Sequence, residues 1–308
     1  MTVELAHLSD VHVLAAPGAG PRWFEHLNKR WIGRLNLLLH RKHDERLFAA
    51  AARDLAERPP DHLVVTGDLS NLAHPGEFAR ARQLLEATGL PPERVSLVPG
   101  NHDAYIRSAV RDRAFERAFA PYLGGDPAWP RVQRAGDVLL VATNSAVPTP
   151  WFTAYGRLGA PQLAAVEQAL AASAAAVKVV AVHHPPVIAT GELDRPWRRN
   201  RDGLALLAAC RRGGADVVLC GHTHLPFRCR VPGERPLWVL CAGSTTRPAR
   251  ALGQGGTYER YRVEAGRVVA TRRAFDPDAD AFVDLEQVEL ELGAAAVSAS
   301  RPPGSERG

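Results

Sequence analysis

The sequence predicts an α/β fold in which short buried strands alternate with helices. Short apolar runs rich in β-branched residues recur along the chain, and segments with helical periodicity separate them. Proline, glycine and aspartate mark the ends of these runs. A polar cluster follows five of the runs, and open α/β sheets bind their ligands at the carboxyl ends of their strands.

Apolar patterning gives the elements in chain order. Strands are expected at residues 3–9, 62–66, 95–98, 137–142, 178–182, 216–220, 237–242, 258–263 and 267–274. The last three are expected to close the fold as an antiparallel set. Helices are expected at residues 44–57, 75–88, 107–119, 160–172 and 202–211. Asp44 is placed to cap the first helix, Pro59 and Pro60 end it, and Gly89 ends the second.

The length and the late loss of pattern predict one large domain followed by a tail. The chain has 308 residues, which is within reach of a single α/β domain. The pattern decays from residue 276, and residues 284–292 read equally as a short acidic strand or helix. Residues 294–308 are rich in small residues, proline and glycine, a composition typical of disorder. We therefore expect a domain over residues 1–275 and a partly disordered tail over residues 276–308.

An insertion at residues 13–43 interrupts the alternation before the first helix. Large apolar residues recur there every three to four positions, with cations between them. The apolar residues are Trp23, Leu27, Trp31, Leu35, Leu38 and Leu39, and the cations are Lys29, Arg30, Arg34, Arg41 and Lys42. A basic amphipathic helix of this kind binds an anionic membrane surface or covers an acyl chain. The alternative is a helix that packs its apolar stripe on the core of its own domain.

The composition favours a cytoplasmic protein with anionic partners. No apolar run reaches the ~18 residues of a membrane-spanning helix, and the N-terminus lacks the pattern of a signal peptide. The four cysteines have no metal-site or redox spacing, so we expect reduced and mostly buried thiols. The net charge of +5 suits phosphate esters, nucleic acid or acidic lipid, although solvated arginines alone also account for it.

The polar clusters supply carboxylate, amide and imidazole groups at the strand ends. They are Asp10 and His12; Asp68; Asn101, His102 and Asp103; His183 and His184; and His222 and His224. Mixed nitrogen and oxygen donors suit Mn, Fe or Zn. Seven ligands are too many for one ion and are about right for two divalent ions that share a bridge. Asp68 is the expected bridge, because a carboxylate has two oxygens and Gly67 lets the backbone come close.

These blocks resemble the signature of the calcineurin-like metallophosphoesterase superfamily, which is D-x-H, G-D, G-N-H-D/E, H and G-H-x-H. All five occur in order from Asp10 to His224, so the resemblance covers about the first 275 residues. It implies two facing mixed β-sheets flanked by helices, a four-layer αββα sandwich, with a dimetal site at the strand ends. It also implies that a metal-bridging hydroxide attacks phosphorus in a phosphoester or pyrophosphate.

The resemblance further implies a role for each residue of the blocks. The ligands of the first metal would be Asp10, His12, Asp68 and His224. The ligands of the second metal would be Asp68, Asn101, His183 and His222. His102 would be catalytic, acting on the leaving oxygen or the developing charge, and Asp103 would orient it.

The adjacent histidines are assigned by their position after the strand. His183 leads an H-x-P pattern and is expected to be a ligand, whereas His184 would face the substrate or pack against Pro185. The remaining histidines have no such context, and we expect them to be surface or core residues. They are His7, His26, His40, His43, His62 and His74.

The blocks leave the substrate open. The length and the His-His-Pro-Pro block resemble bacterial cyclic-nucleotide phosphodiesterases, while the insertion resembles the enzymes that cleave UDP-2,3-diacylglucosamine at a membrane. We therefore expect a phosphate-ester small molecule or a nucleotide-lipid, with residues 23–43 able to contact an anionic inner membrane and no stable nucleic-acid partner. The alternative is a non-catalytic metal-binding scaffold, but such members typically lose His102 or several ligands, and none is lost here.

Overall fold

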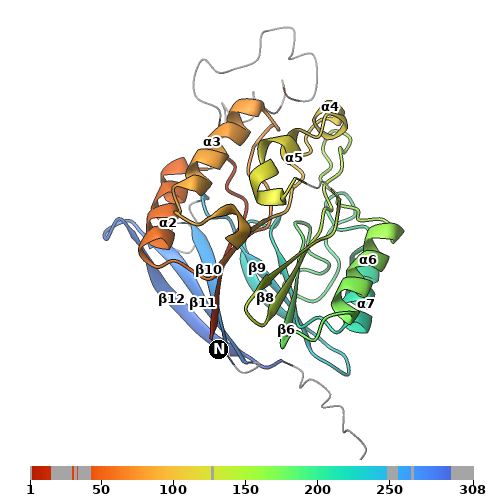
Figure 1. Cartoon of the computed structure of the whole chain (residues 1–308). Helices are drawn as coiled ribbons and strands as arrows, with labels where there is room; N and C mark the ends of the chain where they lie inside the picture. Colours follow the sequence, from red (N-terminus) through yellow and green to blue (C-terminus); the bar gives the residue numbers. More distant parts are fainter. Residues whose placement is uncertain are drawn as a thin grey trace, which may run out of the picture.

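Two six-stranded mixed sheets face each other at the centre of the molecule (Figure 1). The computed structural model describes residues 2–14, 30, 33, 43–125, 128–247, 256–264 and 267–292. The first sheet has the order β12-β11-β10-β1-β2-β3 and the second the order β4-β5-β6-β7-β9-β8. Helices cover the outer face of each sheet, so the predicted αββα sandwich is confirmed.

The strands are short in the parallel centre of each sheet and longer at one edge. Those of the first sheet are β1 (Val3–Leu8), β2 (His62–Val65), β3 (Val95–Leu97), β10 (Thr257–Glu264), β11 (Arg267–Asp276) and β12 (Ala281–Leu290). Those of the second are β4 (Arg131–Ala135), β5 (Val138–Ala142), β6 (Val177–Ala181), β7 (Val217–Cys220), β8 (Pro226–Val231) and β9 (Leu237–Ala242).

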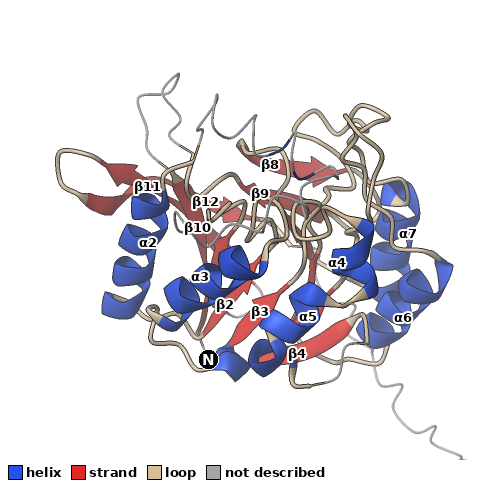
Figure 2. Ribbon diagram, turned by 90° about the horizontal axis from the view of Figure 1, so that it is seen from above, coloured by secondary structure: helices blue, strands red, loops and turns tan. Residues whose placement is uncertain are grey.

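The helices lie on the two outer faces and above one edge of the sandwich (Figure 2). They are α2 (Glu45–Glu57), α3 (Pro75–Glu86), α4 (Arg107–Arg111), α5 (Ala114–Ala118), α6 (Ala160–Ala171) and α7 (Gly203–Gly213). Asp44 caps α2 as predicted, because its side chain accepts a hydrogen bond from the backbone N–H of Arg46. None of the helices in the described part of the chain has the length and apolar character to cross a bilayer.

Alternating side chains along the strands build three apolar layers. In β1, Leu5 points between the sheets, while Leu8 packs under the helices of the first sheet. In β5, Leu140 points between the sheets and Val141 packs under α6 and α7. Each fully buried aliphatic side chain contributes roughly 1.5–3 kcal/mol, so these layers hold the strand ends in place. All four cysteines are buried and unpaired, as predicted for the thiols.

Several elements differ from the sequence expectation. The helix expected at 107–119 is divided into α4 and α5, because Arg113 adopts a left-handed φ of 51°. The expected closing antiparallel set is wrong for residues 237–242, since β9 pairs parallel with β7 in the second sheet. β10 and β11 do form an antiparallel pair, and β12 adds to them, so the sheet includes residues placed in the tail.

The insertion at 13–43 lies mostly outside the described residues, as does the segment 293–308. Residues 13, 14, 30, 33 and 43 of this range are described, and two of them, Arg30 and Gly33, contact the segment that follows β2. The Arg30 guanidinium donates to the carbonyl oxygens of Leu72 and Ala73 at 2.8 and 2.6 Å. Gly33 approaches Leu72 and the Tyr105 hydroxyl so closely that a Cβ there would overlap both. Arg30 and Gly33 therefore lie on the domain beside the loops that carry the polar clusters.

Candidate metal centre

The polar clusters of both sheets meet at one end of the sandwich. The loops after β1, β2 and β3 come from the first sheet, and the loops after β6 and β7 come from the second. Backbone hydrogen bonds continue past the strand ends, from Asp10 N to Gly67 O at 3.0 Å and from Gly221 N to His183 O at 3.0 Å. These bonds continue the pairing of the sheets into the loops. The loop segments that carry the clustered side chains are therefore fixed relative to one another.

A left-handed backbone turns the clustered side chains toward one another. Five candidate ligands have φ between 43° and 69°, and they are Asp10, His12, Asp68, His222 and His224. Aspartate and histidine tolerate this region better than bulky residues do, but each such residue still costs about 1–3 kcal/mol. Strain of this kind persists where the surrounding structure enforces it, and it concentrates at functional sites.

The first group of side chains contains two carboxylates and two imidazoles. Asp10, His12, Asp68 and His224 each place one ligand atom within 4.8 Å of the others. His12 Nε2 lies 3.1 Å from His224 Nε2, and His224 Nε2 lies 3.2 Å from Asp10 Oδ1. Ser9 Oγ and the backbone N–H of His222 donate to Asp10 Oδ2 and hold its carboxylate in place. This group has the donors and spacing to hold one divalent ion.

The second group is centred on the amide oxygen of Asn101. His183 Nε2 lies 3.1 Å from Asn101 Oδ1, and His222 Nδ1 lies 2.9 Å from it. His183 donates its Nδ1–H to the carbonyl of Thr66 at 2.7 Å, which leaves Nε2 as the ligand atom. Burial lowers the pKa of His222 well below its usual value and keeps the imidazole neutral, the form that binds metals.

Asp68 lies between the two groups. Its Oδ2 is 3.6 Å from His12 Nε2 in the first group and 3.4 Å from His183 Nε2 in the second. Burial alone would raise the pKa of this carboxyl, but the facing His183 and its neighbours lower the pKa well below the usual range. Burial disfavours a proton on His183, yet the Asp68 carboxylate outweighs it and raises the pKa of His183 to about 9.

The donor set fits bound divalent cations. In the described part of the chain, the ion pairs of the buried Asp10 and Asp68 are with histidines, not with lysine or arginine. His184 Nε2 and His222 Nε2 are buried without a hydrogen-bond partner. Buried carboxylates and unpartnered ring nitrogens are costly unless a cation compensates them. The predicted pair of metal ions therefore suits this site.

Asp103 does not orient His102, which corrects the sequence prediction. The Nδ1–H of His102 donates to the carbonyl of Asn71 at 2.6 Å. Both oxygens of Asp103 are instead occupied by the backbone N–H groups of Leu69, Ser70 and Gly100, at 2.9–3.2 Å. Because Asp103 directly follows His102, its side chain turns back under the loop. It ties the loop after β3 to the loop after β2.

The predicted substrate contact of His184 is contradicted by its burial. Its side chain is fully buried, its Nδ1 hydrogen-bonds with Ser145 Oγ at 2.8 Å, and its ring packs against His222 at 4.6 Å between centroids. His184, His183 and His222 each offer a ligand atom within 4.8 Å of the others. His184 thus packs against the second group from within the protein interior.

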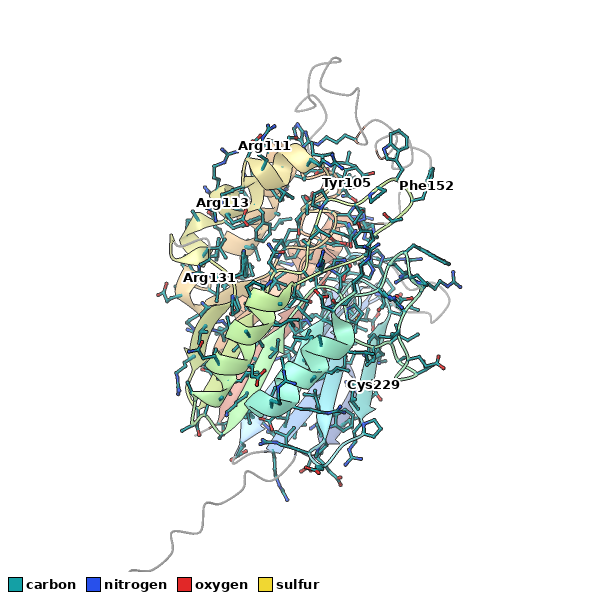
Figure 3. All side chains as sticks on the ribbon, turned by 90° about the vertical axis from the view of Figure 1, so that its right-hand side faces the viewer. Tyr105, Arg111, Arg113, Arg131, Phe152 and Cys229 are labelled. Carbon is teal, nitrogen blue, oxygen red and sulfur yellow. The ribbon has the colours of Figure 1, made fainter. Side chains whose placement is uncertain are left out.

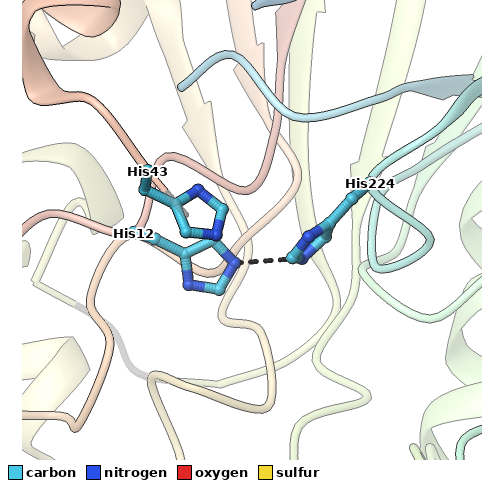
Figure 4. Close-up of side chains that lie close together, drawn as sticks. All are labelled: His12, His43 and His224. Carbon is cyan, nitrogen blue, oxygen red and sulfur yellow. Dashed lines mark hydrogen bonds between the residues drawn. The ribbon is translucent and has the colours of Figure 1, made fainter. Parts of the chain in front are cut away.

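His43 joins the first group, although it was expected to be an ordinary surface or core residue. Its ring packs on His12 at 4.2 Å between centroids and lies 5.3 Å from His224 (Figure 4). His43 is the last residue of the insertion and directly precedes the N-cap of α2, so no strand-end pattern marked it. His7 and His62 are buried as core residues, and His26 and His40 lie outside the described residues.

The chain is similar to a known family and to several curated proteins. A model of the calcineurin-like phosphoesterase family matches residues 3–226. A glycerophosphodiester phosphodiesterase of Enterobacter lignolyticus is 33% identical over 178 residues, which are 55% of this chain and 58% of that protein. A probable cyclic nucleotide phosphodiesterase of Rhodococcus erythropolis is 28% identical over 230 residues, covering 71% of this chain and 64% of that protein. The chain thus spans about three fifths of the length of these relatives.

Solved structures show the same fold at much lower identity. A dimetal phosphatase from Danio rerio aligns with a TM-score of 0.61 at 13% identity, covering 94% of this chain and 99% of that one. A purple acid phosphatase from yellow lupin aligns with a TM-score of 0.62 at 11% identity, covering 94% of this chain and 53% of that one. Because the family model matches residues 3–226, which are more than half of the chain and contain all five blocks, the chain belongs to the calcineurin-like phosphoesterase family.

Proposed function

We propose that this chain is a metal-dependent phosphodiesterase that hydrolyses a phosphodiester of a small molecule. The observation that carries the proposal is the pair of ligand groups joined by Asp68. Asp10, His12, Asp68 and His224 would hold one ion, and Asp68, Asn101, His183 and His222 the other. When bound, two divalent ions supply an activated water and neutralise charge on the phosphoryl oxygens.

The contribution of the chain itself is to place a proton donor and to keep the ligands rigid. His102 is half-buried, and its Nδ1 is engaged by the Asn71 carbonyl, so Nε2 is the nitrogen left for substrate. In its protonated form, His102 would donate from Nε2 to the leaving oxygen of an alcohol, which is a poor leaving group without a proton. The relatives named as phosphodiesterases support a diester substrate.

A pocket beside His102 favours a nucleotide over a glycerophosphodiester. The cavity has a volume of about 540 Å³ and is lined by Tyr105, Arg107, Trp151 and Tyr155 among others. The ring of Tyr105 is stacked on His102 at 5.7 Å, so the pocket opens next to the proposed proton donor. Figure 3 shows Tyr105 and Phe152, which follows Trp151, at the same end of the molecule. Aromatic side chains stack on nucleobases, which a glycerol group cannot exploit.

The test is to compare substrates with Mn²⁺-loaded protein. Cyclic AMP, glycerophosphoethanolamine and UDP-2,3-diacylglucosamine are measured side by side, with bis-p-nitrophenyl phosphate as a control for the chemistry. We expect turnover of cyclic AMP, and a several-fold increase of its KM in Trp151→Ala. Turnover of the control without cyclic AMP would reject the nucleotide and keep the phosphodiesterase. No turnover of any substrate would reject the proposal.

UDP-2,3-diacylglucosamine, a pyrophosphate substrate, is a second candidate because Arg30 and Gly33 of the insertion contact the domain, and Gly33 lies against Tyr105 of the pocket. The amphipathic stripe expected within residues 23–43 lies almost wholly outside the described residues, so its contact with an anionic membrane stays a prediction. Deleting residues 23–39 should weaken association with anionic liposomes and spare hydrolysis of the small control diester. Unchanged liposome binding would assign the insertion to packing.

A further inference from the structure

His43 is a histidine of the metal centre that lies outside the five sequence blocks. It comes from the segment before α2, and its ring packs on His12 of the first group at 4.2 Å between centroids. The ligand nitrogens of His12, His43 and His224 all lie within 4.8 Å of one another. His12 and His224 also belong to the group that contains Asp10 and Asp68, so an ion held there would face His43.

The hydrogen bonds of Thr246 determine which nitrogen of His43 is available. The Thr246 hydroxyl lies 2.9 Å from the carbonyl oxygen of Val11 and 2.9 Å from His43 Nδ1. A carbonyl only accepts, and a hydroxyl has one proton, so Thr246 donates to Val11 and accepts from His43 Nδ1–H. The neutral His43 ring therefore has its unprotonated lone pair at Nε2.

The backbone holds this ring in position. Asp44 N donates to the carbonyl oxygen of Thr246 at 2.8 Å, which fixes the residue next to His43 against the loop after β9. Ser244 and Thr246 in turn donate to the carbonyl oxygens of Asp10 and Val11. His43 is thus tied, through two hydrogen-bonded segments, to the backbone of a ligand in the first group.

We propose that His43 Nε2 is an additional ligand of the ion held by Asp10, His12, Asp68 and His224, an inference that rests on the proposed metal centre. Two nitrogens that bind one ion at ~2.1 Å lie at most ~4.2 Å apart, so shifts of a few tenths of an ångström would complete the set. A third imidazole makes this position richer in nitrogen than the signature residues alone. Nitrogen-rich sites favour Fe²⁺, Co²⁺ or Zn²⁺ over Mn²⁺ or Mg²⁺.

The direct test is a Co²⁺ titration of metal-free protein, followed by calorimetry and by the visible absorption of the bound ion. The informative variant is His43→Asn, because its amide can keep the bond to Thr246 while the Nε2 ligand is lost. We expect one of the two binding steps to weaken by at least about tenfold, with a changed Co²⁺ spectrum. Asn101→Ala is the matched comparison and should weaken the other step.

Each result of these titrations either supports or overturns the assignment of His43 as a ligand. A His43→Asn titration and spectrum identical to wild type would overturn it and leave His43 as a packing residue. His43→Ala should give the same loss as His43→Asn, and thermal unfolding of the metal-free variants checks that they fold. If wild type binds two Co²⁺ ions but hydrolyses no diester, the proposed activity fails and the ligand inference stands. If wild type binds no Co²⁺ at this position, both fail.

Discussion

At the scale of single residues, neighbours in the sequence act on different parts of the centre. The partly exposed His102 is held by the Asn71 carbonyl, whereas the buried Asp103 ties two loops together. His183 points into the centre, while His184 is buried behind it. The motif predicted which residues gather here. It did not predict where each side chain points, because that depends on left-handed φ angles and on backbone partners far away in the chain.

Asp103 accepts hydrogen bonds from the loops after β2 and β3, and we expect the protein to lose stability when these bonds are weakened. In Asp103→Asn, one carboxylate oxygen becomes an NH₂ group that cannot accept from Leu69, Ser70 or Gly100. We expect the free energy of unfolding of the metal-free protein to fall by about 1–3 kcal/mol, measured by denaturant titration. A variant with wild-type stability and impaired turnover would instead support the orienting role that the sequence suggested.

His7 predicts acid sensitivity away from the metal centre. Burial lowers the pKa of His7 to about 3, while the unfolded chain keeps a value near ~6.5. The unfolded state therefore binds the proton first, and stability falls as pH drops below ~6.5 toward 3. Between pH 7 and pH 5 this one group costs about 2 kcal/mol in the metal-free protein. His7→Gln should lose about 2 kcal/mol less than wild type over that interval, and an equal loss in both proteins would contradict the assignment.

At the scale of elements, glycines allow the backbone segments of the loops at the centre to approach one another closely. The strand ends and the five blocks were predictable, since apolar runs and polar clusters are local signals. β4 and β8 were missed, because β4 is short, polar and half-exposed and β8 begins with a proline. His43 was missed because its place beside His12 depends on the loop after β9, about 200 residues away.

Gly100 predicts a geometric requirement of the loop after β3. A Cβ at this position would overlap Asp68 Oδ1 and would lie 2.8 Å from Asp68 Cγ. Gly100→Ala should push the Asp68 carboxylate away, and a displacement of ~1 Å can cost about 100-fold in rate. The control is Gly233→Ala, whose Cβ would meet only the flexible Arg211 side chain. Equal turnover of a control diester by both variants would argue against the close packing of the two loops.

At the scale of the whole molecule, the centre joins the two sheets. Asp10, Asp68 and Asn101 come from the first sheet, and His183, His222 and His224 from the second. The apolar layer between the sheets brings these edges together before any ion binds. The αββα sandwich was predicted from the family resemblance and not from the apolar pattern of the sequence. Local periodicity does not encode which distant strands pair with one another.

This arrangement predicts that metal removal loosens the molecule as a whole. Ions that bind only the folded state stabilise it by about 2.7 kcal/mol per site at 100 times the Kd. Chelation with EDTA should therefore lower the Tm of wild type, and it should lower the Tm of Asn101→Ala by less, because one site is already lost. Differential scanning calorimetry measures both shifts. Equal Tm values with and without EDTA would mean that no ion bridges the sheets.

The most direct measurement of the proposed activity pairs metal content with turnover in two adjacent variants. Wild type, Asn101→Ala and His102→Ala are loaded with Mn²⁺, analysed for bound metal and assayed on bis-p-nitrophenyl phosphate. Wild type should bind two ions and turn over. Asn101→Ala should lose one ion together with its activity, whereas His102→Ala should keep both ions and lose about 10²–10⁴ in rate. Wild-type turnover in either variant, or a wild type that binds its ions without hydrolysis, would contradict the account.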